Sequence, residues 1–192
     1  MSDEIKLFLE CIPAGDDDCT EQAALTLGRI GDAALPALRD MLAEPDPDPR
    51  WWAARALAAV GTQAAGQVLL DALADPDRDV RACVAYGLGE IGAEAAIPGL
   101  VHLLADDSPL VCRVAADSLA RIGAPAVPAL IDALQSEMVL TRAGAARALS
   151  FIQPQEAIPA LFAALDDPSA IVTHYAEEAL ERMGVGLVLF QP

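Results

Sequence analysis

Apolar positions follow a helical period within a longer repeat that runs along the chain. The phrase LGRIGDAALPAL returns in altered form four times, and its copies begin at Leu27, Leu57, Leu88, Leu119 and Leu149. A glycine within the phrase sets the register of each repeat and falls at Gly31, Gly61, Gly92, Gly123 and Gly184, with Gln153 in the one remaining place. These places are almost evenly spaced. A period of about 31 residues holds two helices of about three turns and two short loops, so the pattern predicts a helical solenoid.

Each repeat holds one helix after its glycine, the A helix, and one before the next glycine, the B helix. Glycine ends a helix and an early proline opens the next one, which sets these boundaries. The B helices are expected at 20–30, 50–60, 81–91, 111–122, 142–152 and 173–183, and a first helix at 3–12 completes six pairs. We expect one domain over 1–192, with repeats at about 2–30, 32–60, 62–91, 93–122, 124–152 and 154–183 and a tail at 184–192.

Four places on each B helix, counted back 8, 7, 4 and 1 from the glycine, lie on one stripe. In the first B helix they hold Ala23, Ala24, Leu27 and Ile30, and later B helices repeat small residues, Leu and a β-branched residue. This stripe is the expected core. The last B helix has Glu177 where the others have Ala, so we expect it to be a polar cap on the end of the array.

The repeat also resembles a known family. An acidic turn, Val-Arg, an Ala-rich stretch and Leu-Gly-x-Ile-Gly occur together in DPDRDVRACVAYGLGEIG, from Asp75 to Gly92. This pattern is similar to the HEAT-like repeats named after phycobilisome lyases, and the resemblance covers nearly the whole chain. It implies an all-α fold, an α-α superhelix of the HEAT-like or armadillo type with about six helix pairs. It also implies that the B helices line a concave surface.

The polar side of the B helices lies at places 10, 6 and 2 before each glycine, which we call the B-helix strip. The strip holds six Arg and four acids, an excess of two positive charges in a chain whose net charge is −17. We expect it to bind a partner through Trp51, Arg55, Tyr86, Glu90, Arg113, Asp117, Arg121, Arg147, Phe151 and His174. The aromatic and Arg side chains are of the kinds that dominate interfaces. The alternative is that the Arg side chains pair with acids of neighbouring helices.

Three further Arg residues, Arg50, Arg81 and Arg142, stand 11 places before the glycine. We expect them to form a structural ladder with turn acids such as Asp48 and Asp79, rather than to touch a ligand.

Charge and composition exclude several classes of function. With 12 Lys and Arg against 29 Asp and Glu, binding to nucleic-acid phosphates is not expected. No apolar run reaches the length of about 18 residues that marks a candidate membrane span, and two acids precede the first Lys. We therefore expect no membrane span, no secretory signal and a cytoplasmic monomer. Cys11, Cys19, Cys83 and Cys112 show no CxxC spacing and are expected to be free thiols.

Candidate chemistry is sparse. The chain has only His102 and His174, and neither has an obvious partner for catalysis. We expect no metal site and no cofactor. The sequence therefore favours a non-catalytic scaffold or adaptor that binds a protein or peptide of acidic or mixed charge. The alternative, implied by the resemblance, is a bilin lyase subunit or chromophore chaperone, with Arg55, Arg113 and Arg147 holding the bilin propionates.

The chain ends in VGLVLFQP after Gly184. We expect these apolar residues either to fold back over the last helices and close the core, or to dock a second protein.

Overall fold

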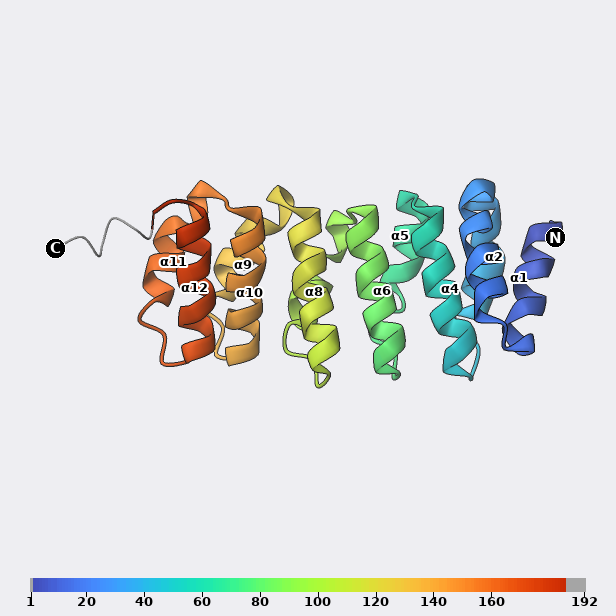
Figure 1. Ribbon diagram of the computed structural model, residues 1–192, viewed down its shortest axis with the longest axis horizontal. Helices are drawn as coiled ribbons and strands as arrows, with labels where there is room; N and C mark the ends of the chain where they lie inside the picture. Colours follow the sequence, from blue (N-terminus) through green and yellow to red (C-terminus); the bar gives the residue numbers. More distant parts are fainter. Residues whose placement is uncertain (1, 186–192) are drawn as a thin grey trace. The chain divides into compact units, whose positions relative to one another are not determined.

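The computed structural model describes residues 2–185, and all its regular structure there is helical (Figure 1). The longer helices are α2 (Asp17–Ile30), α4 (Pro47–Val60), α6 (Arg78–Ile91), α8 (Pro109–Ile122), α10 (Val139–Ile152) and α12 (Ala170–Arg182). The others are α1 (Asp3–Ala14), α3 (Leu35–Met41), α5 (Gln63–Leu70), α7 (Ile97–Leu103), α9 (Val127–Ala133) and α11 (Ile158–Ala164). Short 3-10 turns precede four of these at η1 (Gly31–Ala34), η2 (Glu94–Ala96), η3 (Ala124–Ala126) and η4 (Gln155–Ala157). The expected all-α repeat fold is confirmed.

The B helices end where the glycine register predicts, but they begin about one turn earlier than expected. In α4 the carboxylate of Asp46 accepts a hydrogen bond from the Asp48 amide, and Pro47 occupies the first turn. Asp at the N-cap and Pro at the first helical position both favour a helix start. In α4 and α6 residues of the acidic turn therefore supply the first turn of the helix. Gln153, which replaces the glycine, takes the same left-handed backbone, with φ 56°.

The chain is divided into two compact units, an N-terminal unit over 1–93 and a C-terminal unit over 94–192. In the N-terminal unit α2, α4 and α6 lie side by side, with α1 against α2 and the short α3 and α5 packed behind (Figure 1). In the C-terminal unit α8, α10 and α12 lie side by side in the same way, and α7, α9 and α11 pack behind them. Each unit thus presents one face made of long helices.

The predicted stripe forms the core of both units. Its places 8, 7 and 4 before the glycine are buried in the first five B helices, and the Leu of every copy is fully buried. The expectation that the final place is equally buried is wrong for four of the five helices, where Ile30, Ile91, Ile122 and Ile152 are half-buried. That residue is the last of its helix and borders the turn, so packing covers it on fewer sides. Glu177 is exposed, as expected for a polar cap.

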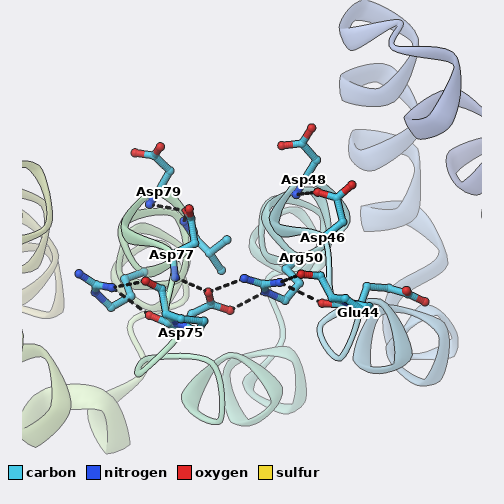
Figure 2. A network of polar contacts seen from close by, with 11 residues as sticks. Glu44, Asp46, Asp48, Arg50, Asp75, Asp77 and Asp79 are labelled. Carbon is cyan, nitrogen blue, oxygen red and sulfur yellow. Dashed lines mark hydrogen bonds and ion pairs between the residues drawn. The ribbon is translucent and has the colours of Figure 1, made fainter.

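The Arg ladder exists, but its acids differ from those expected (Figure 2). Arg50 donates from Nε and Nη2 to the two carboxylate oxygens of Asp75, at 2.8 and 2.9 Å, and from Nη1 to the carbonyls of Glu44 and Pro45. The side chains of Arg50 and Asp75 are only 9% and 7% exposed. The predicted partners, Asp48 and Asp79, lie instead in the exposed first turns of α4 and α6, where Figure 2 shows them pointing away from Arg50.

The same clamp recurs in the C-terminal unit. Arg142 donates to both carboxylate oxygens of Asp167, at 2.6 and 3.1 Å, and to the carbonyls of Ser136 and Glu137. The hydrogen bond from Arg142 is the largest influence on Asp167 and holds the pKa of its carboxyl below the ordinary value of 3.8. A clamp therefore ties one repeat to the acidic turn of the next.

The expectation of four free thiols is wrong for two cysteines. Cys11 of α1 and Cys19 of α2 form a disulfide, with their Cα atoms 5.8 Å apart. Their separation in sequence is 8, and the sharp turn at Gly15, with φ 67°, folds α1 back against α2. The antiparallel hairpin brings the two Cα atoms to a separation that is usual for a disulfide. Cys83 and Cys112 are free.

Two further expectations concern membrane-spanning segments and the apolar C-terminal tail. Among the described helices, none alone is long and apolar enough to span a membrane. Only α8 together with the segment 124–133 has sufficient length and apolar character, and these two parts are bent by 116° relative to each other. The expected folding back of the apolar tail concerns residues 186–192, which lie outside the described residues.

Candidate partner-binding face

The B-helix strip runs along the long helices of each unit, and on α4 of the N-terminal unit it includes Trp51, which lies next to Trp52. Trp51 packs edge to face against Trp52, with ring centroids 4.8 Å apart. Both rings are half-buried. Two large aromatic rings that are partly open to solvent suit contact with another molecule.

Arg55 of α4 does not project freely from this face. Its guanidinium forms an ion pair with Glu21 of α2, and both side chains are about one-quarter to one-third exposed. The interaction joins neighbouring long helices, as the pairing alternative predicts. Tyr86 and Glu90 follow on α6, and both are exposed.

Cys83 lies beside this ion pair and is buried. Burial raises the pKa of its thiol to about 12, and the nearby Arg55 and Glu21 act in opposite directions. The thiol lies 3.7 Å from the backbone carbonyl of Trp51, to which it donates. Because reactive cysteines need a thiolate, this raised pKa disfavours a reactive role for Cys83.

In the C-terminal unit Arg147 of α10 forms the centre of the strip. It donates to the Asp117 carboxylate of α8 at 2.7 Å, and its guanidinium lies 5.4 Å from the Phe151 ring and 6.0 Å from the Tyr175 ring. Burial lowers the pKa of Arg147, but hydrogen bonding to Asp117 and Tyr175 outweighs it, and the net pKa is raised. Arg147 is therefore a fixed cation.

Phe151 projects from α10 between two guanidinium groups and is 48% exposed. The guanidinium of Arg182 lies 4.8 Å from the centre of the Phe151 ring. Arg182 also forms an ion pair with Glu178, at 2.5 Å. Cations beside an aromatic face hold it in place through the ring quadrupole. The arrangement presents a held aromatic ring at the surface.

Two hollows adjoin Arg147. One, of about 390 Å³, is lined by Asp117, Ala120, Arg121, Arg147 and Phe151. The other, of about 250 Å³, has mostly apolar walls from α8, α10 and α12 and includes Arg113. His174 lines neither of them. It is exposed, with its ring centroid 5.4 Å from that of Tyr175.

The structure thus brings together Asp117, Arg121, Arg147 and Phe151 of the predicted set, with Arg113 at the second hollow. Trp51 and Arg55 lie on α4, and Tyr86 and Glu90 lie on the neighbouring α6 of the N-terminal unit. Sequence reasoning missed Leu140, Gly144, Ile171 and Tyr175, which line the second hollow. A comparison of residue types at equal places across the repeats, extended beyond the strip, would have found them.

Other chemistry is limited on the described chain. No group of three or more His, Cys, Asp or Glu residues is placed to hold a metal ion within residues 2–185. Burial is also the main cause that raises the pKa of Cys112. What the face offers is recognition: aromatic rings, fixed cations and apolar hollows.

Solved structures with this arrangement are numerous, and three of them illustrate the range. The complex of CpcE and CpcF, the phycocyanin lyase of Nostoc sp. PCC7120, matches with 25% identity over 94% of this chain and 77% of that chain, with a TM-score of 0.53. An archaeal HEAT-like repeats protein from Thermococcus onnurineus NA1 matches with 14% identity over 95% and 81%, with a TM-score of 0.65. A designed armadillo repeat protein in complex with the peptide (KR)4 matches with 19% identity over 95% and 100%, with a TM-score of 0.52.

No curated protein matches the chain. The family of HEAT repeats does, over residues 5–82, 42–120 and 104–181, so the matches together span nearly all of the described residues. The repeat register, the paired helices and this match agree. The chain belongs to the HEAT repeat family.

Proposed function

We propose that this protein is a non-catalytic scaffold or adaptor that binds another protein or a peptide on the face of its long helices. The observation that carries the proposal is the set of exposed or half-exposed aromatic side chains held beside cations on that face, above all Phe151 between Arg147 and Arg182. Ordered aromatic and Arg side chains lose little conformational freedom on binding, which is why they dominate interface energies.

The family supports this proposal in general terms. HEAT repeats stack helix pairs into extended surfaces, and the similar CpcE and CpcF are themselves found as a complex of two proteins. We propose a partner of mixed or acidic charge, a monomeric state for the free chain and a cytoplasmic location. Arg55 and Arg147 are held in ion pairs with acids of neighbouring helices. In this proposal these two Arg side chains position their neighbours, and the aromatic rings of the B-helix strip contact the partner.

Co-purification from the source cells tests the proposal. The wild-type chain is compared with a variant carrying Tyr86→Ser and Phe151→Ser, and with a control carrying Arg39→Ser and Asp132→Ser on the exposed surface of α3 and α9. We expect a partner that is retained by the wild type and the control but lost from the double aromatic variant. Equal recovery with all three chains would contradict a long-helix binding face.

A second candidate rests on the similarity to the phycocyanin lyase complex. In a bilin lyase subunit or chromophore chaperone, Arg side chains would bind the propionates of an open-chain tetrapyrrole. Arg113 has the freest guanidinium of the three proposed, because Arg55 and Arg147 are paired with acids. Mixing the protein with a bilin decides between the candidates, since a lyase or chaperone changes the absorbance spectrum of the pigment and a protein scaffold leaves it unchanged.

A further inference from the structure

The first turns of the long helices differ in kind between the two units. At the place 13 positions before the glycine, α2, α4 and α6 carry Asp18, Asp48 and Asp79. At the same place α8, α10 and α12 carry Leu110, Leu140 and Ile171, which are 39%, 49% and 46% exposed. Asp is the residue type that favours a helix start, and exposed Leu or Ile adds nothing to it. These three side chains therefore need an explanation other than the stability of the helices.

A hollow opens beside this row. Its walls include Leu140, Ile171 and Tyr175, and its volume is about 250 Å³. Its walls also include Leu104, and Gly144 of α10. Other long helices carry Gln, Trp, Cys, Val or Tyr at the place of Gly144. A Cβ atom on Gly144 would lie 2.8 Å from the Leu104 side chain, so the missing side chain lets Leu104 pack close against α10.

The charges around the hollow are engaged, with one exception. Arg147 is paired with Asp117. Asp106 accepts a hydrogen bond from the Ser108 amide, and neither Asp106 nor Asp107 is free. Arg113 is exposed and makes no hydrogen bond or ion pair with any residue of the part of the chain that the structure describes. The charge available to a ligand at this hollow is therefore a single positive one.

We propose that this hollow, with the row Leu110, Leu140 and Ile171, binds an amphipathic segment of a partner protein that presents aliphatic side chains and a carboxylate on one face. This proposal rests on the proposed function and names the chemistry of its partner. The aliphatic side chains would cover the row and enter the hollow, and the carboxylate would pair with Arg113. A helical segment fits the spacing, because residues seven apart on a helix are about 10.5 Å apart and neighbouring packed helices are about 8–10 Å apart.

The net charge of −17 also limits the charge that the partner segment can carry. A polyacidic partner would be repelled by the protein as a whole, whereas one carboxylate beside apolar side chains gains from Arg113 at short range and is little affected by charges beyond about 8 Å at physiological salt. A basic segment would leave Arg113 facing a like charge. The hollow therefore selects apolar segments with few, well-placed acids.

Three fluorescein-labelled synthetic peptides, each long enough for about four helical turns, test the proposal by anisotropy against the full chain at physiological salt. The first is helical, with Leu at every third or fourth position and Glu beside them on the same face. The second has Lys for each Glu, and the third has Ser for each Leu. We expect the Glu peptide to bind, the Lys peptide to bind at least tenfold more weakly, and the Ser peptide not to bind.

Variants of the protein place the peptide. Leu140→Asp and Ile171→Asp introduce the residue type that the N-terminal unit already has at this place. We expect these variants to fold like the wild type, checked by circular dichroism, and to lose the Glu peptide. Leu7→Asp, at an exposed apolar residue of α1, is the control and should bind like the wild type. Arg113→Glu should invert the preference, so that the Lys peptide binds more tightly than the Glu peptide.

Several results would overturn this proposal. Binding of the Glu peptide that survives Leu140→Asp and Ile171→Asp places the peptide elsewhere, and the scaffold function then stands without this site. Failure of all three peptides to bind the wild type rejects the assigned chemistry, while the scaffold function is judged separately by co-purification. A chain ending at Val185 that binds the Glu peptide at least tenfold more tightly than the full chain would identify the chain's own last residues as the occupant.

Discussion

Arg50 shows how much a single side chain contributes to one repeat junction. Four of its donor contacts reach Asp75 and two carbonyls, and the pair is nearly excluded from water. Removing one partner of such a pair leaves the other charge buried, which costs about 3–5 kcal/mol. We therefore expect Arg50→Ala to lower the free energy of unfolding in urea by about that amount.

The control for Arg50 is Arg78, which lies 3.9 Å from Asp79 with both side chains more than half exposed. Exposed pairs contribute about 0–1 kcal/mol, so Arg78→Ala should leave the urea midpoint nearly unchanged. Equal effects of the two substitutions would show that the Arg50 clamp is no stronger than a surface pair.

Asp167 predicts how stability depends on pH. Its folded-state pKa is held below 3.8, chiefly by the hydrogen bond from Arg142. A carboxyl with a lowered folded pKa stabilises the fold above its unfolded pKa, and this contribution is lost as pH falls through the folded pKa. Wild type should thus lose more stability between pH 5 and pH 3 than Asp167→Asn does, as measured by urea unfolding at both values. Parallel losses in the two proteins would contradict this role for Asp167.

At the residue scale, the sequence predicted which Arg side chains form ion pairs better than it predicted the acids with which they pair. It placed Arg50 and Arg142 in a structural ladder, but it named Asp48 and Asp79 as the acids. The choice depends on the path of the turn, which carries Asp75 under the helix and leaves Asp48 in the exposed first turn. The acids that form the clamp stand 25 residues after their Arg, in the turn of the next repeat, and not beside the Arg residues where we expected the partners.

Among elements, α2 and α4 approach each other closely at one glycine. A Cβ atom on Gly28 would lie 2.6 Å from the backbone carbonyl oxygen of Ala59, which has no freedom to move aside. Gly28→Ala gains about 1 kcal/mol of helix propensity, yet overpacking of this kind costs about 1–3 kcal/mol. We expect net destabilisation, measured as a lower melting temperature.

Gly66 in α5 provides the matched control. A Cβ atom there would lie 3.4 Å from the Ile91 side chain, an ordinary contact. Gly66→Ala should therefore be neutral or stabilising. A Gly28→Ala variant as stable as Gly66→Ala would mean that α2 and α4 can separate at little cost.

The hairpin of α1 and α2 is closed by the Cys11–Cys19 disulfide. Thiol titration of the denatured, unreduced chain should find two reactive thiols, from Cys83 and Cys112, and four after reduction. Because a closed loop of this length restricts the unfolded chain, reduction should lower stability by about 2–3 kcal/mol. Four thiols without reductant would contradict the bond.

The sequence predicted the elements themselves well, because glycine and proline mark helix ends and the small-residue stripe marks the buried face. It missed the disulfide, since a spacing of eight is not a recognised motif and only the hairpin turn at Gly15 brings the two thiols together. The sequence also did not predict the second hollow, because Leu140 and Gly144 lie outside the B-helix strip.

At the scale of the whole molecule, charge opposes folding. The chain carries 29 acids and 12 Lys and Arg, and net charge destabilises a compact state through self-repulsion that salt screens. The melting temperature should therefore rise by several degrees when NaCl is raised from a low to a physiological concentration. A fall with added salt would show that the attraction within ion pairs exceeds the overall repulsion.

The ion pairs that join neighbouring repeats connect residues only 25 to 34 positions apart in the sequence. Each such pair therefore spans about one period of the repeat. A gene that duplicates or deletes one period in frame keeps every pair of this kind except those at the cut, and the new neighbours meet in register wherever both repeats carry the clamp residues. The clamp thus makes the length of the array a heritable variable, one that recombination can change without a new core having to evolve.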